Sequence, residues 1–136
     1  NWMMVENARR LSALDYVTAA EAGQAWARRI QQWWADGHDV LVTPTLTTPP
    51  PRLGQLAPTA PIAQLMTGMG ALTAFCWPFN VTGQPAFSLP LHWTPEGLPV
   101  GVQLIAAYGR EDILLRLAAQ LEAARPWAAR VPLIHA

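Results

Sequence analysis

The chain has 136 residues, about the length of one domain, and its formal net charge is zero at pH 7. Hydrophobic residues make up 51% of it and charged residues only 13%, against an average charged share of about 25%. The sequence contains no basic stripe and no apolar run near the roughly 20 residues that span a bilayer, which argues against nucleic-acid partners and against a membrane protein.

The low charge is too little to cover the surface of a free-standing domain of this size. We therefore expect other protein to cover part of that surface, either the rest of a longer chain or a second copy in a homodimer. The first residue is Asn1 rather than methionine, which favours a fragment of a longer chain. Cys76 is the single cysteine, so no internal disulfide can form, and the sequence fits a reducing, cytoplasmic location.

Residues 1–37 have a helical pattern. Thr18 and Glu21 have the spacing of a capping box, which predicts a helix start at that point. Gly37 is the expected C-terminal cap. An apolar stripe with helical spacing runs along this segment and consists of Trp26, Ile30, Trp33 and Trp34. The stripe is explained by packing alone, so we assign it no chemistry.

Residues 38–64 combine a strand with a proline-rich loop. The apolar run at residues 39–43 ends at Pro44, which lacks the N–H that a central strand needs. The following run to Pro61 is rich in proline and predicts an extended connection rather than a helix. We expect this loop to lie against a larger body through spaced apolar anchors, which are Leu46, Leu53, Leu56 and Ile62.

Residues 65–136 predict a helix, a hairpin and a second helix. The first helix spans residues 68–77 and is stopped by Pro78. Apolar residues alternate over residues 86–93, turn residues follow at 94–97, and residues 100–107 are apolar on both faces. The last helix begins near Glu111 and ends at Pro126. These patterns indicate an α/β fold whose sheet is covered on both faces.

No catalytic centre is evident in the sequence. Ser12 and Ser88 are the only serines, and neither lies in a motif that activates a nucleophile. The apolar neighbours of Cys76 predict an inert core thiol. The remaining candidate ligands lack metal-binding spacing, so we expect neither a metal nor a cofactor; they are His38, His92 and His135.

Linked segments of the third part resemble the C-terminal portion of the amidase signature family. They read Asn80-x-Thr82-Gly83-x-Pro85-Ala86, then Leu89-Pro90, then Gly97-Leu98-Pro99-Val100-Gly101-Val102-Gln103-Leu104. The resemblance covers about residues 20–127. Residues 82–93 and 106–112 are most similar to the branch that includes 6-aminohexanoate cyclic-dimer hydrolases.

The resemblance implies part of an amidase that hydrolyses carbon–nitrogen bonds, with a mixed sheet covered by helices on both faces. The family's Ser-Ser-Lys triad lies in an N-terminal region, and this chain has no lysine, so we expect the chain alone to be inactive. It would complete the sheet and line the substrate channel. Positions similar to channel-facing ones are Gly70, Thr73 and Trp77. Their spacing places them on one face of a single helix, although core packing explains the same spacing.

These three positions suit a small apolar amide better than a charged substrate. Subunits of tRNA-linked amidotransferases usually carry an acidic residue where Thr73 stands, which argues against that branch. The expected partner is the missing N-terminal part of the amidase, in the same or a separate chain. The alternative is a non-enzymatic interaction domain that docks a partner through its proline-rich loop and exposed aromatic residues.

Overall fold

The computed structural model describes residues 2–131, with side-chain surroundings given from residue 5 onward. His135, one of the candidate ligands, lies outside the described residues. The elements follow in the order α1 (Trp2–Ala8), α2 (Ala13–Ala35), β1 (Val40–Pro44), α3 (Ile62–Thr73), α4 (Trp77–Thr82), β2 (Ala86–Trp93), β3 (Pro99–Ala106) and α5 (Glu111–Ala124). None of the helices in this part of the chain is both long and apolar enough to cross a membrane.

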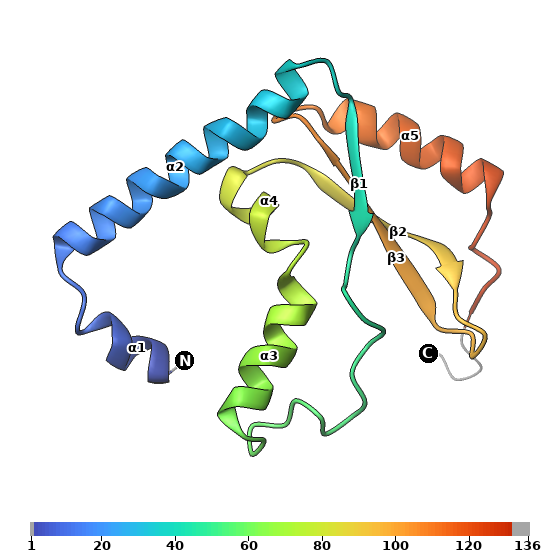
Figure 1. Cartoon of the computed structure of the whole chain (residues 1–136). Helices are drawn as coiled ribbons and strands as arrows, with labels where there is room; N and C mark the ends of the chain where they lie inside the picture. Colours follow the sequence, from blue (N-terminus) through green and yellow to red (C-terminus); the bar gives the residue numbers. More distant parts are fainter. Residues whose placement is uncertain (1, 132–136) are drawn as a thin grey trace.

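The strands form a three-stranded sheet in the order β1-β3-β2, and both pairings are antiparallel (Figure 1). Each edge strand of this sheet carries a proline. Pro44 is the last residue of β1, and Pro90 lies at the register shift in β2. Proline lacks a backbone N–H and is therefore restricted to edges and bulges. The prolines explain why β3, which has none after its first residue, takes the central position.

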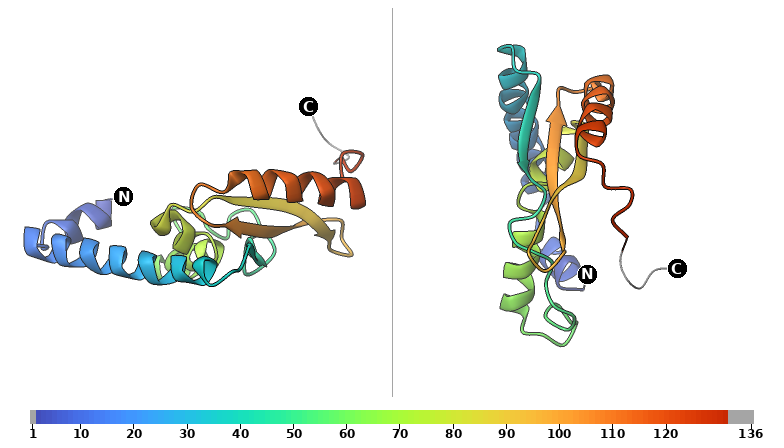
Figure 2. Two further views of the ribbon diagram at one scale, coloured as in Figure 1. Left: turned by 90° about the horizontal axis from the view of Figure 1, so that it is seen from above. Right: turned by 90° about the vertical axis from the view of Figure 1, so that its right-hand side faces the viewer.

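Helices cover both faces of the sheet, as predicted. Figure 2 shows α5 on one side of the strands and α2 on the other. On the α5 side, Leu104 and Ala106 of β3 pack with the fully buried Leu114. On the opposite side, Ile105 of β3 packs with Trp34 of α2 and Phe79 of α4. Successive residues of a strand point to opposite faces, so β3 contributes to both cores.

The expected start of α2 is wrong. The capping box is formed by Ser12 and Asp15, not by Thr18 and Glu21. The Ser12 hydroxyl accepts from the Asp15 N–H at 3.1 Å, and the Asp15 carboxylate accepts from the Ser12 N–H at 2.8 Å. Residues 13–17 contain no helix breaker, so the earlier box starts the helix and Thr18 lies inside it. The expected end is confirmed, because Gly37 has a φ of 100° and donates to the Trp34 carbonyl.

The expected single helix over residues 68–77 is also wrong. The chain forms α3, then a turn at residues 74–76, then α4. Pro78 does not end a helix but lies in the first turn of α4, where no intrahelical N–H bond is required. Gly83 ends α4 with a φ of 71° and donates to the Phe79 carbonyl at 2.9 Å.

The proline-rich loop lies beside α3 (Figure 1). The Thr47 hydroxyl donates to the Ala71 carbonyl at 2.9 Å, and the Gln64 amide donates to the Gln55 carbonyl at 2.7 Å. Of the four expected anchors, Leu46 and Leu56 are half-buried, whereas Ile62 and Leu53 are exposed.

The expected hairpin and last helix are present. The Gly97 N–H donates to the Thr94 carbonyl at 2.9 Å, which closes the turn between β2 and β3. Burial alternates over the first half of β2, as its sequence pattern predicts. α5 begins at Glu111, two residues before its first half-buried side chain, and ends two residues before Pro126. The α/β fold class is therefore confirmed, and every strand pair in the described residues is antiparallel.

Candidate functional site

The three positions proposed to line a substrate channel lie on two helices rather than one. Gly70 and Thr73 belong to α3, and Trp77 is the first residue of α4. The premise of a single helical face is therefore wrong, but all three residues are exposed. The Thr73 hydroxyl donates to the Met69 carbonyl at 2.9 Å, which leaves its oxygen as an acceptor. A side chain added at Gly70 would meet nothing within 4 Å.

Trp77 pairs with Trp26 of α2. The ring centroids lie 5.7 Å apart and the rings are inclined at 42°, within the range of favourable aromatic pairs. Trp77 is 58% exposed, so part of this tryptophan pair lies on the surface of the described chain. The sequence assigned Trp26 only to a packing stripe, and no local pattern links two residues that are so far apart in the chain.

The turn between α3 and α4 is held by Gln103 of the central strand. Gln103 is only 5% exposed. Its amide nitrogen donates to the Phe75 carbonyl at 2.8 Å and to the Thr43 hydroxyl at 3.1 Å. Its oxygen lies 3.5 Å from the Cys76 sulfur, which donates weakly to it and to the Thr45 carbonyl at 3.6 Å. Sequence reasoning placed Gln103 within a family-like segment but gave it no role.

Cys76 and Ser88 are not arranged as nucleophiles. Cys76 is half-buried and its sulfur faces an amide oxygen and a carbonyl. The Ser88 hydroxyl lies 2.6 Å from the Thr45 hydroxyl, not beside a base. Activation of either residue requires a neighbouring base or cation.

The histidines of the described residues do not form a cluster. The His38 ring stacks on Trp33 with centroids 4.1 Å apart, and His92 is exposed on β2. Within residues 2–131 no group of three or more His, Cys, Asp or Glu side chains could hold a metal ion.

The surface around the tryptophan pair is uncharged along α3, which contains no acidic or basic residue. Ion pairs lie on other elements: Arg110 and Arg116 contact Asp112 at the start of α5, at 2.8 and 3.3 Å, and Arg9 contacts Glu6 near α1 at 2.9 Å. The hydrogen bond from Arg110 holds the pKa of Asp112 below its usual value. The pairs on α5 lie on the side of the sheet that α5 covers.

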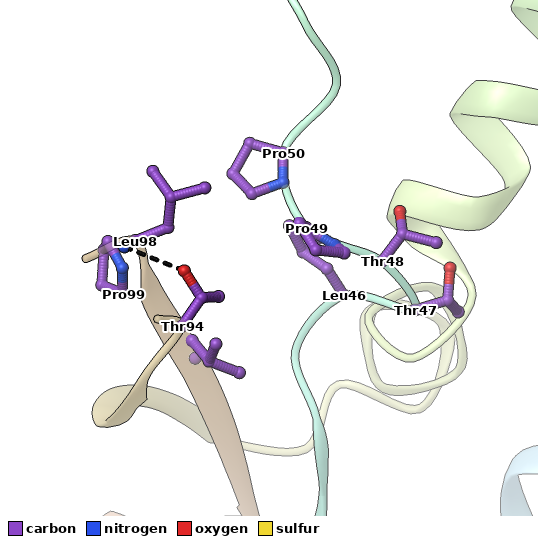
Figure 3. A pocket seen from close by; sticks show the side chains of 10 residues that line it. Leu46, Thr47, Thr48, Pro49, Pro50, Thr94, Leu98 and Pro99 are labelled. Atoms are coloured by element: carbon purple, nitrogen blue, oxygen red, sulfur yellow. Dashed lines mark hydrogen bonds between the residues drawn. The ribbon is translucent and has the colours of Figure 1, made fainter. Parts of the chain in front are cut away.

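A separate cavity of about 190 Å³ lies between the start of the proline-rich loop and the end of the hairpin (Figure 3). Leu46, Pro49 and Pro50 form one wall, and Leu98 and Pro99 form the other. The Thr94 hydroxyl at its edge accepts from the Leu98 N–H at 3.2 Å. None of the three predicted channel residues lines this cavity, and it offers no charged group.

Comparisons with known proteins agree on one family. A sequence model described as Amidase matches residues 1–115. A 6-aminohexanoate-cyclic-dimer hydrolase from Pseudomonas sp. (strain NK87) is 41% identical over 97% of this chain and 28% of its own length. An acylamidase from Rhodococcus erythropolis is 36% identical over 87% of this chain and 26% of its own length.

The solved structure of a 6-aminohexanoate cyclic dimer hydrolase complexed with substrate superimposes with a TM-score of 0.89 at 41% identity. The match covers 97% of this chain and 29% of that one. The chain thus spans less than a third of the length of these relatives.

Proposed function

The chain belongs to the amidase family, and from this premise we propose that it forms part of a longer enzyme that hydrolyses carbon–nitrogen amide bonds. The observation that carries the proposal is the match to a 6-aminohexanoate cyclic dimer hydrolase over 97% of this chain, in sequence and in backbone. In this proposal the chain completes the sheet and supplies a wall of the substrate channel.

The catalytic triad is proposed to come from the N-terminal part of the enzyme. This chain has no lysine to act as a base, and its two serines already have structural contacts. Ser12 caps α2, and Ser88 pairs with Thr45. The missing N-terminal part is therefore the proposed partner of this chain, and no catalytic residue is assigned within it.

The proposed substrate is a small apolar amide. The wall formed by Gly70, Thr73 and Trp77 offers open space, one hydroxyl oxygen and a half-exposed indole, beside a helix without charges. Such a surface favours an aliphatic or aromatic body over a charged one. The relatives named for 6-aminohexanoate cyclic dimer make that compound the first candidate to test.

Hydrolysis of an amide panel tests the proposal. The panel contains 6-aminohexanoate cyclic dimer together with aliphatic and aromatic amides and anilides. We expect turnover by the longer polypeptide that includes this chain and none above background by the chain alone, because the chain carries no triad. Enzyme-dependent turnover by the chain alone would contradict the assignment, as would a longer enzyme inactive on every amide.

Replacement of Trp77 tests the channel wall. In the longer enzyme, Trp77→Ala removes apolar contact area and is expected to raise KM about tenfold for apolar amides with a smaller change in kcat. Leu115→Ala is the matched control, because Leu115 is 60% exposed on α5. Equal KM values for both variants and the unmodified enzyme would remove Trp77 from the wall.

The alternative of a non-enzymatic interaction domain has weaker support. Its proline-rich loop would have to be free to bind a partner, but Thr47 and Gln55 tie that loop to α3. We therefore favour the enzymatic proposal.

A further inference from the structure

We propose that Gln103 is a positioning residue that sets the orientation of Trp77 by fixing the turn between α3 and α4. This inference rests on the proposed function, because it assigns a role to Gln103 through the channel wall. Gln103 is buried and forms its hydrogen bonds with residues outside the tryptophan pair.

Gln103 lies on β3, the central strand of the sheet. β3 is paired on both sides, and Gln103 lies opposite Thr43 of β1 and Ser88 of β2. Antiparallel pairing on both sides leaves its backbone little freedom. A side chain that extends from this position is therefore a fixed reference point for any segment that it binds.

The Gln103 amide joins segments that are distant in the chain. Thr43 is 60 positions away and Phe75 is 28 positions away. Both ends of the amide have partners, so burial at 5% exposure does not leave a polar group unsatisfied. Loss of the amide nitrogen would leave the Phe75 carbonyl without this donor, in surroundings where an unpaired polar group is unfavourable.

α4 is too short to hold its own orientation. The helix has only six residues, far fewer than the about 12 that a helix needs to be stable alone. Its orientation must therefore come from tertiary contacts. Two of these reach the turn directly before Trp77, where Gln103 contacts the Phe75 carbonyl and the Cys76 sulfur.

A second contact to the same turn is too weak to replace Gln103. The Cys76 sulfur also faces the Thr45 carbonyl, at 3.6 Å. A thiol is a weak donor, and it is shared here between two acceptors. The amide nitrogen of Gln103, at 2.8 Å from the Phe75 carbonyl, is the stronger restraint on the turn.

The chain offers a matched control in its other buried glutamine. Gln84 is 6% exposed, donates to the Ala106 carbonyl at 3.2 Å and accepts from the Thr82 hydroxyl at 2.9 Å. Its hydrogen bonds go to the last residue of α4 and to the last residue of β3, not to the turn at residues 74–76. Replacement of Gln84 by methionine therefore removes a comparable buried amide at the far end of α4, five residues from Trp77, and leaves the hydrogen bonds to that turn in place.

The test uses the longer amidase with Gln103→Met, Gln103→Glu and Gln84→Met. Gln103→Met removes both ends of the amide, and Gln103→Glu replaces its donating nitrogen by a carboxyl oxygen. Two readouts are recorded: KM and kcat on the amide that the enzyme turns over best, and the ¹⁹F resonance of Trp77 in protein labelled with 5-fluorotryptophan. That resonance is identified by its disappearance in Trp77→Phe.

We expect both Gln103 variants to raise KM about fivefold to tenfold with a smaller change in kcat, the pattern of lost substrate binding. The Trp77 resonance should shift or broaden in both, because the indole samples more orientations. Gln84→Met should change KM and the Trp77 resonance much less than either Gln103 variant, even where its thermal midpoint falls, because its contact lies at the other end of α4.

Two results would overturn the inference. One is that folded Gln103 variants keep the KM and the Trp77 resonance of Gln84→Met. The other is that both Gln103 variants fail to fold while Gln84→Met folds, because Gln103 would then be a general stabilising residue. If the unmodified enzyme hydrolyses no amide, the proposed function is contradicted instead. The ¹⁹F resonance would still show whether Gln103 sets the orientation of Trp77.

Discussion

At the scale of single residues, the neighbours of Gly101 leave no room for a side chain. A Cβ atom at this position would lie 2.6 Å from the Ser88 hydroxyl oxygen and 2.8 Å from that of Thr45. The same two hydroxyls lie 2.6 Å apart, so they form a polar contact across the glycine between β2 and the residue after β1. Glycine is required here by close approach and not by a left-handed backbone.

Gly101→Ala should therefore destabilise the sheet. We expect the free energy of unfolding of the longer enzyme to fall by about 1–3 kcal/mol, the usual range for overpacking, as measured by chemical denaturation. Adding Ser88→Ala should recover part of this loss, because it removes the nearer of the two oxygens. Gly70→Ala is the control: its Cβ meets nothing, and alanine favours a helix interior by about 0.5–1 kcal/mol. Equal effects at both glycines would contradict this account.

At the scale of elements, the first half of α2 depends on its cap more than on packing. Residues 13–22 are all exposed, and the helix extends away from the sheet at this end (Figure 1). The Ser12–Asp15 capping box is therefore the main local restraint on its start. The backbone N–H and then the hydroxyl of Ser12 donate to the Asp15 carboxylate and lower its pKa below 3.8.

The start of α2 should fray in acid. A lowered pKa in the folded state means that the charged carboxylate stabilises the helix above its ordinary value of 3.8. That contribution is lost as the pH falls through the lower folded value. We expect amide exchange in residues 13–17 to accelerate below about pH 4, relative to the rest of α2. Asp15→Asn should abolish this pH dependence, and an unchanged profile in that variant would show that another group is responsible.

At the scale of the whole molecule, the chain exposes much apolar surface and has little charge to offset it. Leu14 is 74% exposed on α2, and Met66 and Met69 are 60% and 51% exposed on α3. Only 13% of its residues are charged. In relatives more than three times as long, the matching segment is one part of a larger protein. These observations fit a chain whose apolar surface is covered in a longer enzyme.

The isolated chain should associate in solution. We expect it to bind a hydrophobic dye and to elute as a mixture of oligomers in size-exclusion chromatography with light scattering, whereas the longer enzyme should do neither. A homodimer of fixed size that does not bind the dye would support the alternative that a second copy of the chain covers the apolar surface. A dye-silent, monodisperse monomer would contradict the prediction.

Much of the fold was predictable because it follows from local patterns. Alternating apolar residues predicted β2, the turn residues before Gly97 predicted the hairpin, and the acidic pair after Arg110 marked the start of α5. The family resemblance carried by the segment from Asn80 to Ala86 is confirmed. Some predictions were wrong because two local signals competed, as with the capping boxes of Ser12 and Thr18. The prediction at Pro78 was wrong because proline can either end a helix or lie in the first turn of one.

The sequence by itself determined the element types, the hairpin and the family, because helix and strand periodicity and the order of motifs depend on neighbours in the chain. Only the tertiary structure decided that Trp26 meets Trp77, that α3 and α4 are separate helices, and that Gln103 holds the turn between them. The contacts of Gln103 join residues 27 to 60 positions apart, and the tryptophan pair joins two different helices. Such pairs have no periodicity, since their meeting depends on how the sheet and helices pack together.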